Sequence, residues 1–291
     1  MRRFTLPAVI TAALCLITVA IPASASQRTG VSVSGAVSTP TSYTARQLDA
    51  LPQTSYPVTD PGWGTPPTVT GVSLEALVDR STLVLPTGKN TQLRVLLTVT
   101  GDGQRDVFAL GELDAEFGNH PAVLATHGHD VALIVPGDTN RLRSIADVHA
   151  ITVTVSSAAA ATPPPGSVLI ETPHRTYTLS AHRIAALPTR TLTVTFLAGG
   201  VPQTHTETGP SLALLLLSAG ILPTPETSVV AVGGDGYGAA ATLAEAYVGG
   251  KQLLLSTKED GTALAEPRLV TDGDHAGGRY VSGVVVLQVS Q

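Results

Sequence analysis

Three arginines and one histidine are the side chains whose type and position best suit the binding of an anion. They follow two Gly-Asp pairs, Gly137-Asp138 and Gly273-Asp274, and the set comprises Arg141, Arg143, His275 and Arg279. A guanidinium group can hold a carboxylate or phosphate through two parallel hydrogen bonds. We therefore predict cofactor-binding residues here, for an unknown small anionic ligand. The alternative is a surface loop with solvated charges, since exposed arginines are common.

His127-Gly-His129 is the segment that could bind a metal ion. Alternate positions on a strand point to one face, so both imidazoles could reach the same ion. The aligned segment of the second half of the chain, 257–261, reads Thr-Lys-Glu-Asp-Gly and is typical of a polar turn. We therefore predict a surface turn and no metal site.

Gly233-Gly-Asp-Gly-Tyr-Gly238 is a glycine-rich segment that could be a phosphate-binding loop. Such a loop needs a helix N-terminus directly after the glycines. Here residues 237–241 alternate as in a strand, and Asp-Gly is typical of hairpins because glycine tolerates positive φ. The Gly-Asp-Gly segments are predicted to be structural turns.

The remaining candidate residues do not make a catalytic set. No Gly-x-Ser-x-Gly elbow occurs, so no serine nucleophile is predicted. The acidic groups Glu112/Asp114/Glu116 and Glu259/Asp260 are expected on exposed helix or turn positions, where carboxylates are solvated. Basic and aromatic residues are not clustered, which argues against a nucleic-acid partner. No catalytic residue is predicted.

The elements that carry these residues occur twice. Asp of Gly-Asp-Gly lies ten residues before a glutamate in both copies, Asp102–Glu112 and Asp235–Glu245. Gly71-Val-Ser-Leu74 matches Gly209-Pro-Ser-Leu212, and the serine in each is a predicted helix N-cap. The order of these landmarks predicts a tandem duplication. The predicted domains are 26–155 and 167–291, joined by an Ala/Pro linker at 156–166.

The first residues predict export. Arg2 and Arg3 precede an apolar run, and Ala23-Ser-Ala25 has the small-x-small pattern of a cleavage site. A signal peptide is therefore predicted at 1–25. After cleavage we expect a secreted or envelope-associated protein without a membrane span. The alternative is that the apolar run stays uncleaved as a membrane anchor. Cleavage removes Cys15, the only cysteine, and leaves 15 Lys and Arg against 22 Asp and Glu, a net charge of −7.

The order of the landmarks resembles the molybdopterin-binding domain of the sulfite oxidase family. Arg268-Leu-Val270, Gly273 and Gly277-Gly-Arg279-Tyr-Val281 are similar to the family's Arg-Leu-Val-x-Pro-Gly…Gly-x-Arg…Val pattern, and Ala132–Asp138 is the first copy's version. The resemblance spans nearly all of the mature chain in two short copies. It implies an α+β, strand-rich fold of layered sheets and short helices.

The resemblance implies less about chemistry. Catalytic members of the family bind molybdenum through a pterin dithiolene and a cysteine thiolate, a soft ligand. A mature chain without Cys15 has no thiolate, so we expect no cofactor, with molybdopterin as the alternative. The preferred prediction is a non-catalytic binding or structural module with a small anionic ligand or an envelope protein as partner. A molybdopterin-dependent oxidoreductase is the alternative function.

Overall fold

The computed structural model describes residues 30–58 and 68–291. Its first half runs from β1 to β9. The strands and helices of this half are β1 (Val31–Gly35), β2 (Thr41–Tyr43), α1 (Ala45–Asp49), β3 (Thr54–Pro57), β4 (Thr68–Ser73), α2 (Leu74–Asp79), η2 (Thr91–Arg94), β5 (Val95–Gly101), β6 (Gln104–Ala109), α3 (Leu110–Leu113), β7 (Val123–His127), β8 (Asp130–Ile134) and β9 (Val148–Val155).

The second half contains the same order of strands and α-helices, but its 3-10 helix, η3, lies before the last strand, whereas η2 lies before β5. The elements of this half are β10 (Val168–Glu171), β11 (Thr176–Leu179), α4 (Ala181–Ala185), β12 (Arg190–Ala198), β13 (Val201–Gly209), α5 (Leu212–Ser218), β14 (Ser228–Gly233), β15 (Gly238–Thr242), α6 (Ala244–Tyr247), β16 (Leu253–Glu259), β17 (Thr262–Thr271), η3 (Gly277–Arg279) and β18 (Val284–Ser290).

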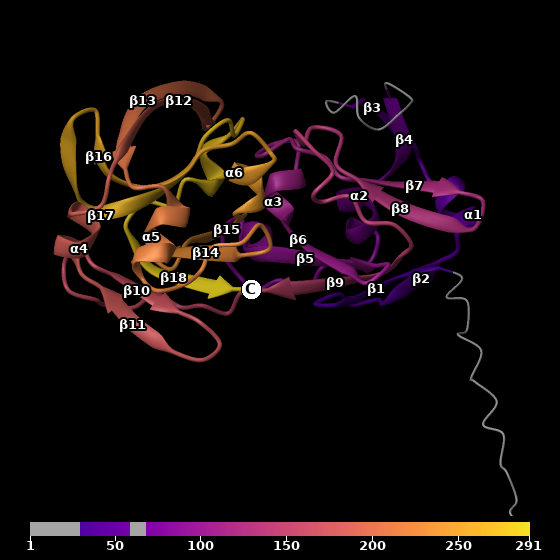
Figure 1. Cartoon of the computed structure of the whole chain (residues 1–291), viewed down its shortest axis with the longest axis horizontal. Helices are drawn as coiled ribbons and strands as arrows, with labels where there is room; N and C mark the ends of the chain where they lie inside the picture. Colours follow the sequence, from indigo (N-terminus) through magenta and orange to yellow (C-terminus); the bar gives the residue numbers. More distant parts are fainter. Residues whose placement is uncertain (1–29, 59–67) are drawn as a thin grey trace, which may run out of the picture.

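The strands form four sheets, two in each half (Figure 1). The five-stranded sheets have the orders β2-β1-β9-β5-β6 and β11-β10-β18-β14-β15. The four-stranded sheets have the orders β3-β4-β7-β8 and β12-β13-β16-β17. In both five-stranded sheets the first strand of the half lies parallel to its last strand, β1 beside β9 and β10 beside β18. The second half therefore repeats the topology of the first.

The predicted fold class is wrong. The protein is mainly β, and its four sheets make the four blades of a propeller-like fold instead of two layered α+β repeats of the sulfite oxidase type. The helices are too short to form a layer, and α5, the longest one described, has seven residues. Leu51-Pro52 and Leu187-Pro188 follow α1 and α4 closely, and proline disfavours helical geometry in the residue before it.

Several local predictions are confirmed. Ser73 and Ser211 cap α2 and α5 through their side chains, as predicted, and Thr44 and Gln47 also form a capping box at the start of α1. Gly103 and Gly236, in the two Gly-Asp-Gly segments, have φ of 71° and 83° and lie in hairpin turns. Positive φ is accessible to glycine at little cost, which explains the residue type at these turns.

Apolar side chains join the two halves as well as filling each of them. Leu93 and Phe117 of the first half belong to the core of the second half. A smaller cluster contains Ala109 of β6 together with Val230, Val232 and Ala240 of β14 and β15. Ala158, within the predicted linker, is buried in that same cluster. The halves therefore pack against each other through apolar surface.

One prediction from the sequence lies outside the described residues. The signal peptide predicted at 1–25 belongs to the segment 1–29. The structure does not support the prediction of a signal peptide or of secretion. In the described ranges, no helix is long and apolar enough to cross a membrane.

Candidate functional site

Two buried glutamates mark the place where the two halves meet. Glu112 lies in α3, directly after β6, and Glu245 lies in α6, close after β15. Both side chains are fully buried. In each half, the strand before the helix and the tight loop after it position the glutamate at the junction. The glutamate that recurs in the two copies of the sequence therefore gives a pair of acids that face each other.

The first network is built around Arg143. Its Nε and Nη2 donate to the two carboxylate oxygens of Asp138, at 2.9 and 2.6 Å, and its Nη1 donates to Oε1 of Glu112 at 2.6 Å. The His120 Nε2 lies 2.8 Å from the same Asp138 carboxylate. Phe108 covers the guanidinium group, 5.1 Å from ring centroid to Cζ. Arg143 therefore makes these polar contacts within the first half.

The second network repeats this geometry around Arg279. Its Nε and Nη2 donate to the carboxylate of Asp274 at 2.8 and 2.7 Å, and its Nη1 donates to Oε1 of Glu245 at 3.0 Å. Lys251 takes the place of His120, and its Nζ donates to Oδ1 of Asp274 at 2.8 Å. Asp and Arg are five residues apart in both networks.

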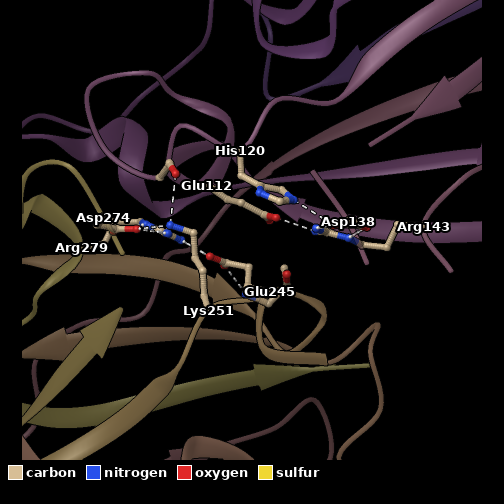
Figure 2. Close-up of polar contacts among 10 residues, drawn as sticks. Glu112, His120, Asp138, Arg143, Glu245, Lys251, Asp274 and Arg279 are labelled. Atoms are coloured by element: carbon tan, nitrogen blue, oxygen red, sulfur yellow. Dashed lines mark hydrogen bonds and ion pairs between the residues drawn. The ribbon is translucent and has the colours of Figure 1, made fainter. Parts of the chain in front are cut away.

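Contacts cross between the halves in both directions, and Figure 2 shows the polar groups of the two networks. The Nζ of Lys251 donates to the carbonyl oxygen of Gly118 at 3.1 Å. The backbone N–H of His275 donates to the carbonyl oxygen of Phe117, and that of Thr139 donates to the carbonyl oxygen of Val248. Each half thus places the loop that follows its Gly-Asp pair on the loop that follows the other half's glutamate.

The pKa values follow from burial and from the facing charges. Burial would lower the pKa of Arg279, but the carboxylates of Glu245 and Asp274 outweigh burial and raise it above its ordinary range. Burial would raise the pKa of Asp274, yet Arg279 and Lys251 hold it below its usual value. Burial raises the pKa of Glu245 to about 7, and the Glu112 charge adds to that rise.

The predicted site residues lie in three different environments. Arg143 and Arg279 are fully buried, so the alternative of a surface loop with solvated charges is wrong for both. Arg141 is exposed, and His275 is exposed although its backbone is held by Phe117. The structure does not place the three arginines and His275 around one common space. Their assignment as cofactor-binding residues stays a prediction.

The prediction of an exposed position for Glu112 is wrong. Its side chain is completely buried against Arg143. The missed signal is a recurring set: a glutamate after the Gly-Asp-Gly hairpin, then Asp with Arg five residues later, in each copy. Residues that are repeated together in a duplicated chain are candidates for mutual contact. Lys251 and His120 have no such signal, because they differ between copies.

The residues of the junction do not fit molybdopterin. The only cysteine is Cys15, so the described ranges contain no thiolate to bind the metal. The guanidinium groups of Arg143 and Arg279, which could have held the pterin phosphate, are fully buried against carboxylates of the chain. We derive no chemistry through this cofactor.

Comparison with known proteins gives one partial likeness. No family model matches the chain, and no curated protein matches it. The structure is similar in part to the sulfane dehydrogenase SoxCD from Paracoccus pantotrophus, at 17% identity and a TM-score of 0.37. That match covers 47% of this chain and 41% of the SoxCD chain. A likeness at this level does not establish a shared fold.

A cleft of about 530 Å³ opens beside the second network. Residues of both halves line the cleft. Its larger polar and aromatic side chains include those of Lys89, Asn90, Phe117, Phe196, Tyr237 and Tyr280. The Tyr237 hydroxyl donates to the carbonyl oxygen of Gly278 at 2.5 Å and accepts from Asn90. Phe196 and Tyr280 lie with ring centroids 4.3 Å apart. The cleft therefore has an aromatic wall fixed by hydrogen bonds and ring packing.

Other candidates from the sequence carry no site in the structure. His127 and His129 are exposed at the β7–β8 turn, and the described residues contain no group of three His, Cys, Asp or Glu side chains placed to hold a metal ion. The Gly-Asp-Gly segments are turns, as predicted.

Proposed function

We propose that the protein is a non-catalytic binding module and that its ligand occupies the cleft between the halves. The observation that carries this proposal is the cleft itself, which has room for a small molecule and an aromatic wall of Phe196, Tyr237 and Tyr280. Ligand sites are concave, largely apolar, and contain a few polar groups that fix orientation. Lys89 and Asp235 supply such groups at the rim.

The lining favours binding over catalysis. The serine in the lining, Ser282, has a cation as its partner, because its hydroxyl accepts a hydrogen bond from Arg268. A serine nucleophile needs a base within hydrogen-bond reach. The buried Arg279 network serves as the scaffold that holds the adjacent Gly277 and Gly278 in the wall of this cleft.

A binding experiment with a blocked cleft tests the proposal. Ligand-observed NMR would use three probes of different chemistry: inorganic phosphate, N-acetylglucosamine and indole. Ala198 is exposed at the cleft, so Ala198→Trp should fill the cleft without disturbing the core, and exposed Ala263 on β17 gives the control Ala263→Trp. We expect a probe to bind wild type and the control but not the blocked variant. Absence of binding by all probes, or equal binding to Ala198→Trp, would contradict the proposal.

The oxidoreductase alternative has a separate test. Purified protein from cells able to make molybdopterin would be analysed for molybdenum by elemental analysis and for pterin by fluorescence after oxidation. A binding module should contain neither at stoichiometric level. Stoichiometric molybdenum would overturn the non-catalytic proposal.

A further inference from the structure

The two networks carry one more negative than positive charge when their four acids are ionised and His120 is neutral; nearby Asp106, whose pKa burial raises to about 7, adds no charge while it keeps its proton. The acids are Glu112, Asp138, Glu245 and Asp274, and the cations are Arg143, Lys251 and Arg279. Their side chains are 0–8% exposed. An uncompensated charge in such a place is costly, and a buried group commonly takes up a proton instead.

Two carboxylate oxygens in this cluster have no hydrogen-bond donor. In each network, Nε and Nη2 of the arginine donate to the aspartate, and Nη1 donates to one oxygen of the glutamate. Oε2 of Glu112 and Oε2 of Glu245 are buried and accept no hydrogen bond. Oε2 of Glu245 lies 2.8 Å from Nη1 of Arg279, without hydrogen-bond alignment. In Figure 2 both carboxyl groups lie between the two arginines.

We infer that Glu112 and Glu245, one from each half, together bind a single proton in the folded protein, and that release of this proton weakens the junction. The proton adds one positive charge, which makes the cluster neutral, and it gives one of the two unpaired oxygens an O–H group. This inference concerns the junction and does not depend on the cleft ligand.

The charged and polar groups around Glu245 come from several elements. Arg279 of η3 and the backbone N–H of Thr242 favour its ionised form, whereas Glu112 of α3 and Asp274 oppose it. On the other side, Glu112 accepts a hydrogen bond from Arg143. Arg143 also donates to Asp138, and the same aspartate contacts the imidazole of His120. The burial that raises the pKa of Glu245 to about 7 agrees with a bound proton at and below neutral pH.

The sign of the pH effect follows from linkage. The folded pKa of Glu245 is above its ordinary value of 4.5, so the stabilisation that the proton provides is complete below pH 4.5 and is lost as the pH rises through about 7. For one proton, the unfolding equilibrium constant rises up to about tenfold for each pH unit in this window.

The test is the pH dependence of unfolding in isosteric variants. Between pH 5 and 7 we expect the unfolding constant of wild type to rise up to about 100-fold relative to Glu245→Gln, because the amide cannot release a proton. Exposed Glu116→Gln is the control and should follow wild type. Glu112→Gln serves as the second variant should Glu245→Gln not fold, and it should also flatten the profile.

A direct readout is the infrared carbonyl band of a protonated carboxylic acid. At pH 6 the band should be weaker in Glu245→Gln or Glu112→Gln than in wild type, and as strong as in wild type in the exposed control Glu116→Gln. If the unfolding constant lost its pH dependence in His120→Gln but kept it in Glu112→Gln and Glu245→Gln, the proton would lie on the histidine and the inference would be overturned. Parallel profiles for wild type and both glutamine variants would overturn it as well.

Discussion

The ammonium group of Lys251 lies 3.1 Å from the carbonyl oxygen of Gly118 and donates a hydrogen bond to it across the junction of the two halves. The same nitrogen donates to Asp274 at 2.8 Å. Lys251 therefore ties the backbone of the first half to the ion-pair network of the second. The imidazole of its counterpart in the first half, His120, lies 2.8 Å from the aspartate of its own half, Asp138.

Lys251→Met should remove this tie and lower the free energy of unfolding by about 2–4 kcal/mol, since two charge-assisted hydrogen bonds of a buried cation are lost. Chemical denaturation followed by circular dichroism measures the loss. Lys258→Met, at an exposed position of β16, is the matched control and should change little. Equal effects of the two variants would show that the Lys251 contact adds nothing.

Arg143→Lys and Arg279→Lys should each destabilise the protein by about 2–4 kcal/mol. Lysine keeps the charge but cannot hold an aspartate through two parallel hydrogen bonds and reach a glutamate as well. Exposed Arg105→Lys should stay within about 0.5 kcal/mol of wild type. Denaturation curves near neutral pH give the comparison, and a mild effect at both buried positions would refute the structural role of the networks.

Gly278→Ala should disturb the aromatic wall of the cleft. A Cβ at Gly278 would lie 2.2 Å from Cε1 of Phe117, so the ring must move, at a cost of about 1–3 kcal/mol. Gly234→Ala is the control, because the nearest atom to its Cβ is 3.8 Å away. Thermal unfolding and the NMR shifts of Phe117 should change in the first variant only. Unchanged Phe117 shifts in Gly278→Ala would contradict this packing.

Asp106→Asn should make the protein more stable at pH 8 but not at pH 4. Burial, followed by the Glu226 charge, raises the pKa of Asp106 to about 7 from 3.8. Its contribution is therefore most favourable below pH 3.8 and is lost as the pH rises through 7. We expect a gain of about 1–2 kcal/mol at pH 8, discounted for partial solvation. Exposed Asp102→Asn should show no such pH dependence, and a gain that is the same at both pH values would contradict the assignment.

Local geometry could be predicted from the sequence. The capping serines at 73 and 211 and the glycine turns depend only on neighbouring residues, because caps and hairpins are closed by hydrogen bonds over a few positions. The repeat could also be read, since matching landmarks such as Glu112 and Glu245 keep their order along the chain. These features are local or comparative, and tertiary contacts do not alter them.

The environment of the charged residues was decided by tertiary structure. Nothing near Glu112 in the sequence indicates burial, because its partner Arg143 lies 31 residues away, and its apolar surroundings come from other strands. The same holds for Arg279, which meets Glu245 at a separation of 34 residues. The sequence alone determined which residues recur, and only the packing of the two halves determined that the recurring charges face each other. Burial and long-range pairing depend on how the sheets meet, which no short pattern encodes.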